Sequence, residues 1–260
     1  TDRDMFIERE KAMDNNLLYL AGQPIFDLDS EQVSMVEILL RWQHAEYGAI
    51  NPTKIIELAS KNGCLSKVAL YVTKQLITFL NDNDGLYDNI SFALNFNMPQ
   101  IINVTLIKAL LNNFDEYGID KSRFIFEATE IDSCPVPLDK VVNHFKWIKQ
   151  QGIKIAIDDF GSGYSTLDYI NNLDVDIIKI DRSLVSDIEK NTRKLDTLTA
   201  LLHLCHKLGV IIVIEGIEHI SQHNLIKGFN ITNILVQGYL YAKPSAIKDK
   251  IFCTSTYFTK

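Results

Sequence analysis

Two adjacent aspartates, Asp158 and Asp159, stand directly after the short apolar run 153–157 (IKIAI). β-branched residues in such a run indicate a buried parallel strand, and we expect this strand to end at the aspartates. The loop that follows, 160–163 (FGSG), is flexible enough to close over a bound molecule. Ligands of parallel α/β proteins bind at the carboxyl ends of the strands, so the pair is a candidate site. In the structural alternative, Asp158 caps the next helix and Asp159 forms a turn.

Polar residues recur within or at the carboxyl end of nearly every strand that the sequence predicts. They are Glu37, Asn95, Glu127, Asp158 with Asp159, Lys179, Glu215 and Gln237. A closed parallel barrel brings such positions to one mouth. Five of them are carboxylates, and two like charges about 4 Å apart repel by about 4 kcal/mol at an effective dielectric constant near 20. The cluster therefore needs protons or cations, and oxygen ligands without cysteine favour Mg²⁺ or Mn²⁺ over Zn²⁺.

Adjacent carboxylates suit a site with two metal ions, because Asp158 can bridge the ions while Asp159 reaches the second one. Such a site predicts hydrolysis of a phosphodiester. Lys179 would stabilise the attacking water or a phosphate oxygen, and Glu215 would take the proton or bind metal. Arg41 is placed to meet a phosphate or a base edge. Two structural alternatives stay open here, namely an internal ion pair between Glu37 and Arg41 and another between Lys179 and Asp181.

The elements that must position these residues alternate along the chain. Strands are predicted at 17–28, 33–42, 90–97, 123–129, 153–157, 176–181, 210–216 and 234–238. Helices are predicted at 53–60, 65–80, 99–117, 138–150, 165–171, 195–208 and 219–227. Eight strands separated mostly by helices predict an α/β protein with a parallel sheet that can close into a (β/α)8 barrel.

Length and composition fit this fold class. The chain of 260 residues can hold one such barrel or two smaller α/β domains. The excess of 33 acidic over 26 basic residues gives a net charge of −7, which argues against a partner of long nucleic acid. The four cysteines form no CxxC pair, and no apolar segment approaches the roughly 20 residues that span a bilayer. We therefore expect a cytoplasmic chain without a membrane segment.

Two other patterns have simpler explanations. The glycines of 161–163 do not form a dinucleotide-binding loop, because Thr166 stands where the third glycine of GxGxxG belongs. Two histidine pairs, His203 with His206 and His219 with His223, have a helical spacing that could bind zinc. No third ligand is evident, so we expect these histidines on the surface.

Eight short stretches give the chain a resemblance to the EAL-domain cyclic di-GMP phosphodiesterases, from about residue 17 to 244. In family order they are QPIFDL (23–28), EILLRWQH (37–44), LNFN (94–97), EATE (127–130), DDFGSGYST (158–166), KIDRSLV (179–185), IEGIE (214–218) and QGYLYAKP (237–244). The resemblance implies a TIM-like (β/α)8 barrel with one strand antiparallel. Residues 1–16 would be an N-terminal linker or helix, and 17–260 the EAL phosphodiesterase domain.

The resemblance also implies an activity, namely hydrolysis of cyclic di-GMP to linear 5′-pGpG with two ions of Mg²⁺ or Mn²⁺. Glu37, Asn95, Glu127 and Asp158 would bind one ion, and Asp158 and Asp159 the other. Lys179 would contact the attacking water, Glu215 would be base or metal ligand, and Glu130 would brace the loop 159–165. The residues that would line the nucleotide are Gln23, Leu39, Arg41, Asp181, Gln237 and Pro244.

Partners and departures complete these expectations. Family members suggest a homodimer, and a chain that opens with Thr1 leaves room for an upstream sensory or GGDEF domain outside these residues. Ile38 replaces the usual alanine or valine and could crowd the pocket, and Asn97 replaces the usual serine. The rival reading is a catalytically silent EAL domain that binds cyclic di-GMP or a protein. It predicts loss of metal ligands, which are all retained here, so we expect an active enzyme.

Overall fold

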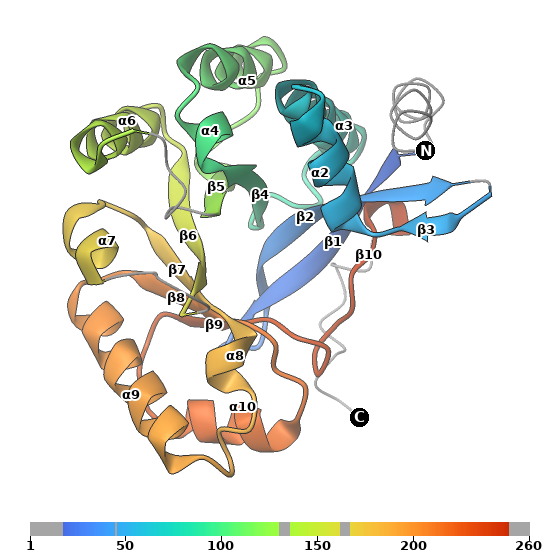
Figure 1. Cartoon of the computed structure of the whole chain (residues 1–260). Coiled ribbons are helices and arrows are strands. Elements are labelled where there is room, and N and C mark those ends of the chain that lie inside the picture. Colours follow the sequence, from blue (N-terminus) through green and yellow to red (C-terminus); the bar gives the residue numbers. More distant parts are fainter. Residues whose placement is uncertain (1–17, 45, 130–135, 162–166, 250–260) are drawn as a thin grey trace.

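A closed eight-stranded barrel forms the centre of the molecule (Figure 1) in the computed structural model, which describes residues 18–44, 46–129, 136–161 and 167–249. Its strands are β1 (Leu18–Asp27), β2 (Val33–His44), β4 (Ser91–Asn97), β5 (Phe124–Thr129), β6 (Lys154–Phe160), β7 (Ile177–Ile180), β8 (Ile211–Ile214) and β9 (Ile234–Val236). They follow one another around the ring in this order, and β1 closes the ring against β9. β1 is antiparallel to both of its barrel neighbours, whereas the other pairs are parallel. The expected TIM-like barrel with one reversed strand is confirmed.

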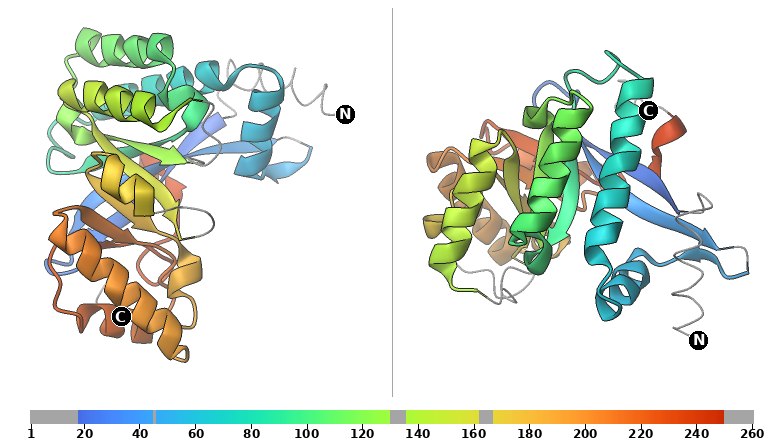
Figure 2. Two further views of the ribbon diagram at one scale, coloured as in Figure 1. Left: turned by 60° about the vertical axis from the view of Figure 1, so that its left-hand side comes forward. Right: turned by 90° about the horizontal axis from the view of Figure 1, so that it is seen from above.

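Helices cover the outside of the barrel. They are α2 (Pro52–Lys61), α3 (Leu65–Asp82), α4 (Met98–Ile101), α5 (Val104–Glu116), α6 (Leu138–Gln150), α7 (Leu167–Asn172), α8 (Arg182–Val185), α9 (Thr192–Lys207) and α10 (Ile220–Lys227), with 3₁₀ turns η1 (Lys121–Arg123) and η3 (Ile247–Asp249). Figure 2 shows α3, α5 and α6 next to one another along one side. Their apolar faces and the outward faces of the strands form the main core. Within the part of the chain that the structure describes, every helix is too short or too polar to span a bilayer.

Several boundaries differ from the sequence prediction. The helix expected at 99–117 is two helices. The first, α4, ends at Ile101, and the side chain of Asn103 then accepts a hydrogen bond from Leu106 N at 3.1 Å, which caps α5. Asn97 forms a capping box with Gln100 at the start of α4. Two short strands were not predicted, β3 (Gly48–Ile50) on β2 and β10 (Ser245–Ala246) on β1. The predicted N-terminal linker or helix at 1–16 lies outside the described residues.

Candidate active site

Two layers of side chains lie inside the barrel, and each layer holds one residue from every strand or from the position directly after it. The apolar layer is Ile25, Met35, Ala93, Ile125, Ala156, Ile177, Val213 and Leu235. Side chains two residues apart on a strand share a face, so the next position toward the mouth also points inward. These positions hold Gln23, Glu37, Asn95, Glu127, Asp158, Lys179, Glu215 and Gln237. We call these eight residues the polar layer.

Lys179 lies at the centre of the ion pairs in the polar layer. Its side chain is 1% exposed, and its ammonium group contacts four carboxylates, three from other strands and one from the residue directly after β8. Nζ lies 2.8 Å from Glu215 Oε1, 3.0 Å from Glu127 Oε2, 3.0 Å from Asp158 Oδ1 and 3.6 Å from Glu37 Oε2. Burial opposes the charge of Lys179, but the four acids outweigh it and raise its pKa well above the ordinary value. The lysine is therefore a fixed cation.

Glu37 is held in its ionised form. Burial disfavours its charge, yet Lys179 and hydrogen bonds from two amides outweigh burial and lower its pKa. The amides are Nε2 of Gln237, 2.7 Å from Oε2, and Nδ2 of Asn95, 3.0 Å from Oε1. The partners of Glu37 thus come from β4, β7 and the end of β9, so the ion pair with Arg41 that the sequence left open is not the one that forms.

The surroundings of Glu127 disfavour its charged form, in contrast to those of Glu37. Its side chain is completely buried, and burial together with the charges of Glu37 and Asp158 raises its pKa well above the ordinary value, although Lys179 opposes the shift. Oxygen Oε2 accepts a hydrogen bond from Lys179, whereas Oε1 has no hydrogen-bond partner among the described residues. A buried oxygen without a partner is costly, so this site suits a proton or a cation.

A β-bulge brings Asp158 and Asp159 to the same side of β6. The pairing with β7 shifts between Ile157 and Phe160, and Asp159 has a φ of 54°, in the left-handed region. Strand alternation alone would send adjacent side chains to opposite faces. Here carboxylate oxygens of both aspartates and of Glu215 lie within 4.8 Å of one another. β6 therefore continues through both aspartates to Phe160, whereas the sequence predicted that the strand ends at the aspartates.

The pKa values of two acids near this bulge are raised. Partial desolvation of the Asp159 carboxylate, followed by the charges of Asp158 and Asp181, raises the pKa of this group to about 6. Burial, followed by repulsion from Asp158 and Glu37, raises the pKa of Glu215 to about 7, although Lys179 opposes the shift. Both groups give up their protons more readily when a cation lies beside them.

The donor set fits divalent cations. Five carboxylates face a single ammonium group in the polar layer and its bulge, so full ionisation leaves an excess of negative charge. The free Oε1 of Glu127 and the clustered oxygens of Asp158, Asp159 and Glu215 are hard ligands, which suit Mg²⁺ or Mn²⁺.

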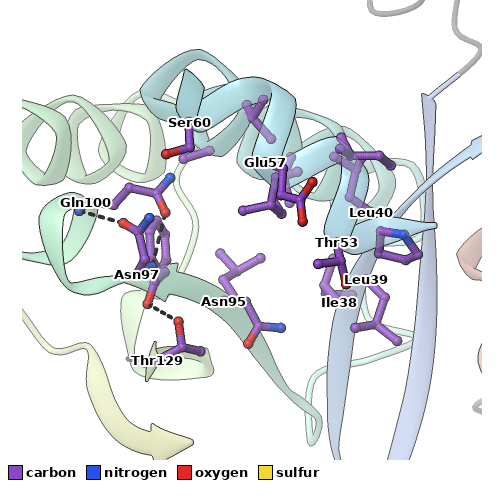
Figure 3. Close-up of a pocket in the computed structure, with 18 of the residues that line it drawn as sticks. Ile38, Leu39, Leu40, Thr53, Glu57, Ser60, Asn95, Asn97, Gln100 and Thr129 are labelled. Carbon is purple, nitrogen blue, oxygen red and sulfur yellow. Dashed lines mark hydrogen bonds between the residues drawn. The ribbon is translucent and has the colours of Figure 1, made fainter. Parts of the chain in front are cut away.

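A cleft of about 600 Å³ opens beside the polar layer, between α2 and the ends of β2 and β4 (Figure 3). Leu39, Arg41, Asn95 and Asp159 are among the residues that line it. Ile38 also lines the cleft. That its larger side chain crowds the pocket stays a prediction. In Figure 3 α2 contributes Thr53, Glu57 and Ser60 to the wall opposite Asn95.

The other sequence-predicted residues lie around the mouth or outside the described chain. Gln23 accepts a hydrogen bond from Gln237 at 3.1 Å and donates one to Ala242 O at 3.1 Å. Asp181 is not the partner of Lys179, because its carboxylate caps α8 by accepting a hydrogen bond from Ser183 N at 2.9 Å. Pro244 is partly buried just before β10. Glu130 lies outside the described residues.

The comparison with protein families decides the relationship. The model of the EAL domain matches residues 8–244. The chain belongs to the EAL domain family. This EAL chain is 32% identical over 235 residues to the cyclic di-GMP phosphodiesterase PdeL of Escherichia coli, covering 90% of the chain and 64% of PdeL. It is 28% identical over 238 residues to the cyclic di-GMP phosphodiesterase NbdA of Pseudomonas aeruginosa, covering 91% of the chain and 30% of NbdA.

A solved structure with the same fold is that of the PaMucR phosphodiesterase in complex with c-di-GMP. It has a TM-score of 0.83 and 25% sequence identity, and the match covers 95% of the EAL chain and 100% of that chain. The chain spans between 28% and 64% of the length of four curated relatives that it matches. The activities of those longer proteins therefore enter only as support for a proposal.

Proposed function

We propose that this chain hydrolyses cyclic di-GMP to linear 5′-pGpG with the help of two divalent ions, Mg²⁺ or Mn²⁺. The observation that carries the proposal is the group of five carboxylates in the polar layer and its bulge. Four of them contact Lys179, and Oε1 of Glu127 has no hydrogen-bond partner among the described residues. Membership of the EAL domain family and relatives named cyclic di-GMP phosphodiesterases support the choice of substrate.

The reaction adds one water across one bond between phosphorus and a ribose 3′ oxygen. The water oxygen bonds to phosphorus, the 3′ oxygen leaves with a proton, and the phosphate stays on the 5′ oxygen. When bound, the two ions would lower the pKa of a water and neutralise charge on the phosphate oxygens. Glu215, with a pKa of about 7, is suited to accept the proton of that water or to bind metal.

The acids divide between the two proposed ion sites. Glu37, Asn95, Glu127 and Asp158 would hold one ion, and Asp158 with Asp159 the other. The amide hydrogen bonds of Glu37 fix the direction of its carboxylate, which lowers the cost of organising the site. Lys179 cannot move without breaking its contacts to four acids, so its ammonium group would orient the attacking water at a fixed point.

The substrate-binding residues would lie on both sides of these ions. Leu39 and Arg41 line the cleft between α2 and β4, and Arg41 can pair with a phosphate oxygen or a base edge. On the opposite side Gln23 and Gln237 form an amide pair next to Glu37. Asp181, Pro244 and Glu130 keep their proposed roles, the first two in lining the nucleotide and the third in bracing the loop 159–165. A homodimer and an upstream sensory or GGDEF domain are also part of this proposal.

The test is to incubate the chain with cyclic di-GMP in Mg²⁺, in Mn²⁺ and in EDTA, and to separate the products by anion-exchange chromatography. We expect pGpG with either ion and none in EDTA. Glu127→Gln is the matched variant, because it keeps the volume and removes the charge, and we expect its turnover to fall by about 100-fold or more.

Two results would contradict the proposal. Tight binding of cyclic di-GMP without turnover in either ion would indicate a catalytically silent receptor or interaction module. Hydrolysis of bis(p-nitrophenyl) phosphate without hydrolysis of the cyclic dinucleotide would indicate a phosphodiesterase with another substrate.

A further inference from the structure

His223 is buried, contrary to the expectation that it lies on the surface. The side chain is in the first turn of α10, on the same helix face as Ile226, and its residue is 4% exposed. His203, His206 and His219 are exposed, as expected. A buried polar ring needs a hydrogen-bond partner, and the partner of His223 lies on another element, close to the mouth of the barrel.

That partner is Tyr241, in the loop 238–244 between β9 and β10. The Tyr241 hydroxyl lies 2.9 Å from Nδ1 of His223, and the two rings meet edge to face with centroids 5.9 Å apart. Tyr241 is 4% exposed, and its ring also packs against that of Phe26 of β1, with the ring centroids 5.6 Å apart. The tyrosine is therefore fixed from two sides, by α10 and by β1.

The protonation state of the pair follows from its surroundings. Burial and the positive charge of Lys227 lower the pKa of His223, while Glu31 acts in the opposite direction. Lys227 and Glu31 neutralise each other in a salt bridge of 3.0 Å. Burial raises the pKa of Tyr241 above its ordinary value. A neutral ring therefore faces a neutral hydroxyl, and with an unprotonated Nδ1 the hydroxyl donates the hydrogen bond.

The residue after Tyr241 connects this pair to the polar layer. Ala242 O accepts the hydrogen bond of Gln23 Nε2 at 3.1 Å. Gln23 Oε1 in turn accepts from Gln237 Nε2 at 3.1 Å, and the same nitrogen donates to Glu37 Oε2 at 2.7 Å. An unbroken path of contacts thus runs from α10 through the loop 238–244 to Glu37.

We propose that His223 and Tyr241 are positioning residues, which hold the loop 238–244 so that Ala242 fixes the amide of Gln23. Gln23 then fixes Gln237, and both amides are directed toward the cyclic dinucleotide and toward Glu37. The neighbouring residue on α10 has a parallel role, because Gln222 donates to Val185 O at 3.2 Å and accepts from the backbone of 218–219. The first turn of α10 therefore contacts both the loop 238–244 and the end of α8.

The experiment compares four variants of the chain by NMR. Tyr241→Phe removes only the hydroxyl, His223→Leu removes the acceptor, and His223→Asn keeps an acceptor near the position of Nδ1. Tyr71→Phe is the matched control, because it also removes one tyrosine hydroxyl hydrogen bond, to Leu18 O at 2.9 Å, which is not part of the path from α10 to Glu37. The readout is the side-chain amide resonances of Gln23 and Gln237 in the metal-free chain.

We expect Tyr241→Phe and His223→Leu to shift or broaden both amide resonances, and His223→Asn and Tyr71→Phe to leave them in place. If His223→Leu does not fold, the result for Tyr241→Phe decides the test, because this substitution removes a single oxygen atom. Unchanged amide resonances in a folded Tyr241→Phe, or equal changes in Tyr71→Phe, would overturn the proposal.

A second readout rests on the proposed function. If the chain hydrolyses cyclic di-GMP, Tyr241→Phe raises KM by about three- to tenfold and changes kcat by less than about twofold, because one ordering hydrogen bond is lost. A lower melting temperature with unchanged KM would reduce the pair to a purely structural role. A chain without turnover would overturn the proposed function, whereas the amide resonances would still decide the role of His223 and Tyr241.

Discussion

Lys179 and Glu127 form an ion pair of 3.0 Å in the middle of the barrel, and neither side chain is more than 1% exposed. Both charges are removed from water, so the pair depends on its neighbours for stability. Three further acids contact the same ammonium group. The catalytic proposal and the folding stability of this chain therefore depend on the same cluster.

Lys179→Met should destabilise the metal-free chain. The variant leaves Glu37, Glu127, Asp158 and Glu215 without their shared cation, and loss of one partner from a buried pair costs about 3–5 kcal/mol. The loss should be largest near pH 8 and smaller near pH 5, where the acids can take up protons. Urea unfolding in EDTA at both pH values measures it. Adding Glu127→Gln should recover part of the loss, and a cost below about 1 kcal/mol at pH 8 would contradict the role of the lysine.

The melting temperature of the metal-free chain should fall as the pH rises through the pKa values of Asp159 and Glu215. The pKa of Asp159 rises from 3.8 to about 6 and that of Glu215 from 4.5 to about 7, so the folded state binds more protons than the unfolded state. This contribution to stability is fully present below the unfolded values and is lost through about pH 6 to 7. Melting curves in EDTA and in Mg²⁺ measure it.

The ion should make that pH dependence smaller, because it favours the ionised carboxylates. Glu215→Gln is the control, since its amide does not titrate, and it should flatten the EDTA curve in the same range. A melting temperature in EDTA that rises across this range, with the same slope in Glu215→Gln, would show that other groups dominate.

The left-handed backbone at Asp159 should distinguish substitutions that differ in conformational freedom. Asp159→Gly fits a φ of 54° without strain, whereas Asp159→Ala should be less stable than the glycine variant by about 1–2 kcal/mol. Asp159→Asn tolerates the conformation but loses the charge, so we expect it to stay folded and to lose activity. Denaturant unfolding of the three variants in parallel tests this, and equal stabilities of glycine and alanine would argue against the bulge.

A methyl group at Gly238 should disturb the mouth. The Cβ of Gly238→Ala would collide with the backbone nitrogen and oxygen of Ile217, which is fixed by hydrogen bonds to Gln237 and Leu240. We expect a loss of about 1–3 kcal/mol and a higher KM. Gly228→Ala is the control, because its φ of −69° suits alanine and it follows α10 away from the cleft. Wild-type stability of Gly238→Ala would contradict this close packing.

Much of the polar layer could be predicted from the sequence, because a polar residue stands within or at the carboxyl end of nearly every predicted strand. Glu37, Asn95, Glu127, Lys179 and Glu215 are such residues, and the structure brings them together. That one strand is reversed was implied only by the family resemblance, since periodicity does not encode strand direction, and the structure identifies this strand as β1.

Other features could not be predicted because they depend on tertiary contacts. Strand alternation predicts that Asp158 and Asp159 diverge, and only the bulge against β7 turns them to one side. His223 has no apolar character, yet α10 buries it because Tyr241 supplies a hydrogen-bond partner. The short β3 and β10 depend on pairing with distant strands, and so their sequences carry little local signal.

The reversed strand also determines where the barrel can be joined to other chain segments. β1 runs against its neighbours, and its first residue, Leu18, pairs with Trp42, beyond Glu37 and Arg41 on β2. In an all-parallel barrel the first strand would begin at the far end. Here any segment fused ahead of Leu18 connects on the side of the carboxylates, so a pull or a twist on that junction would reach Gln23 within five residues.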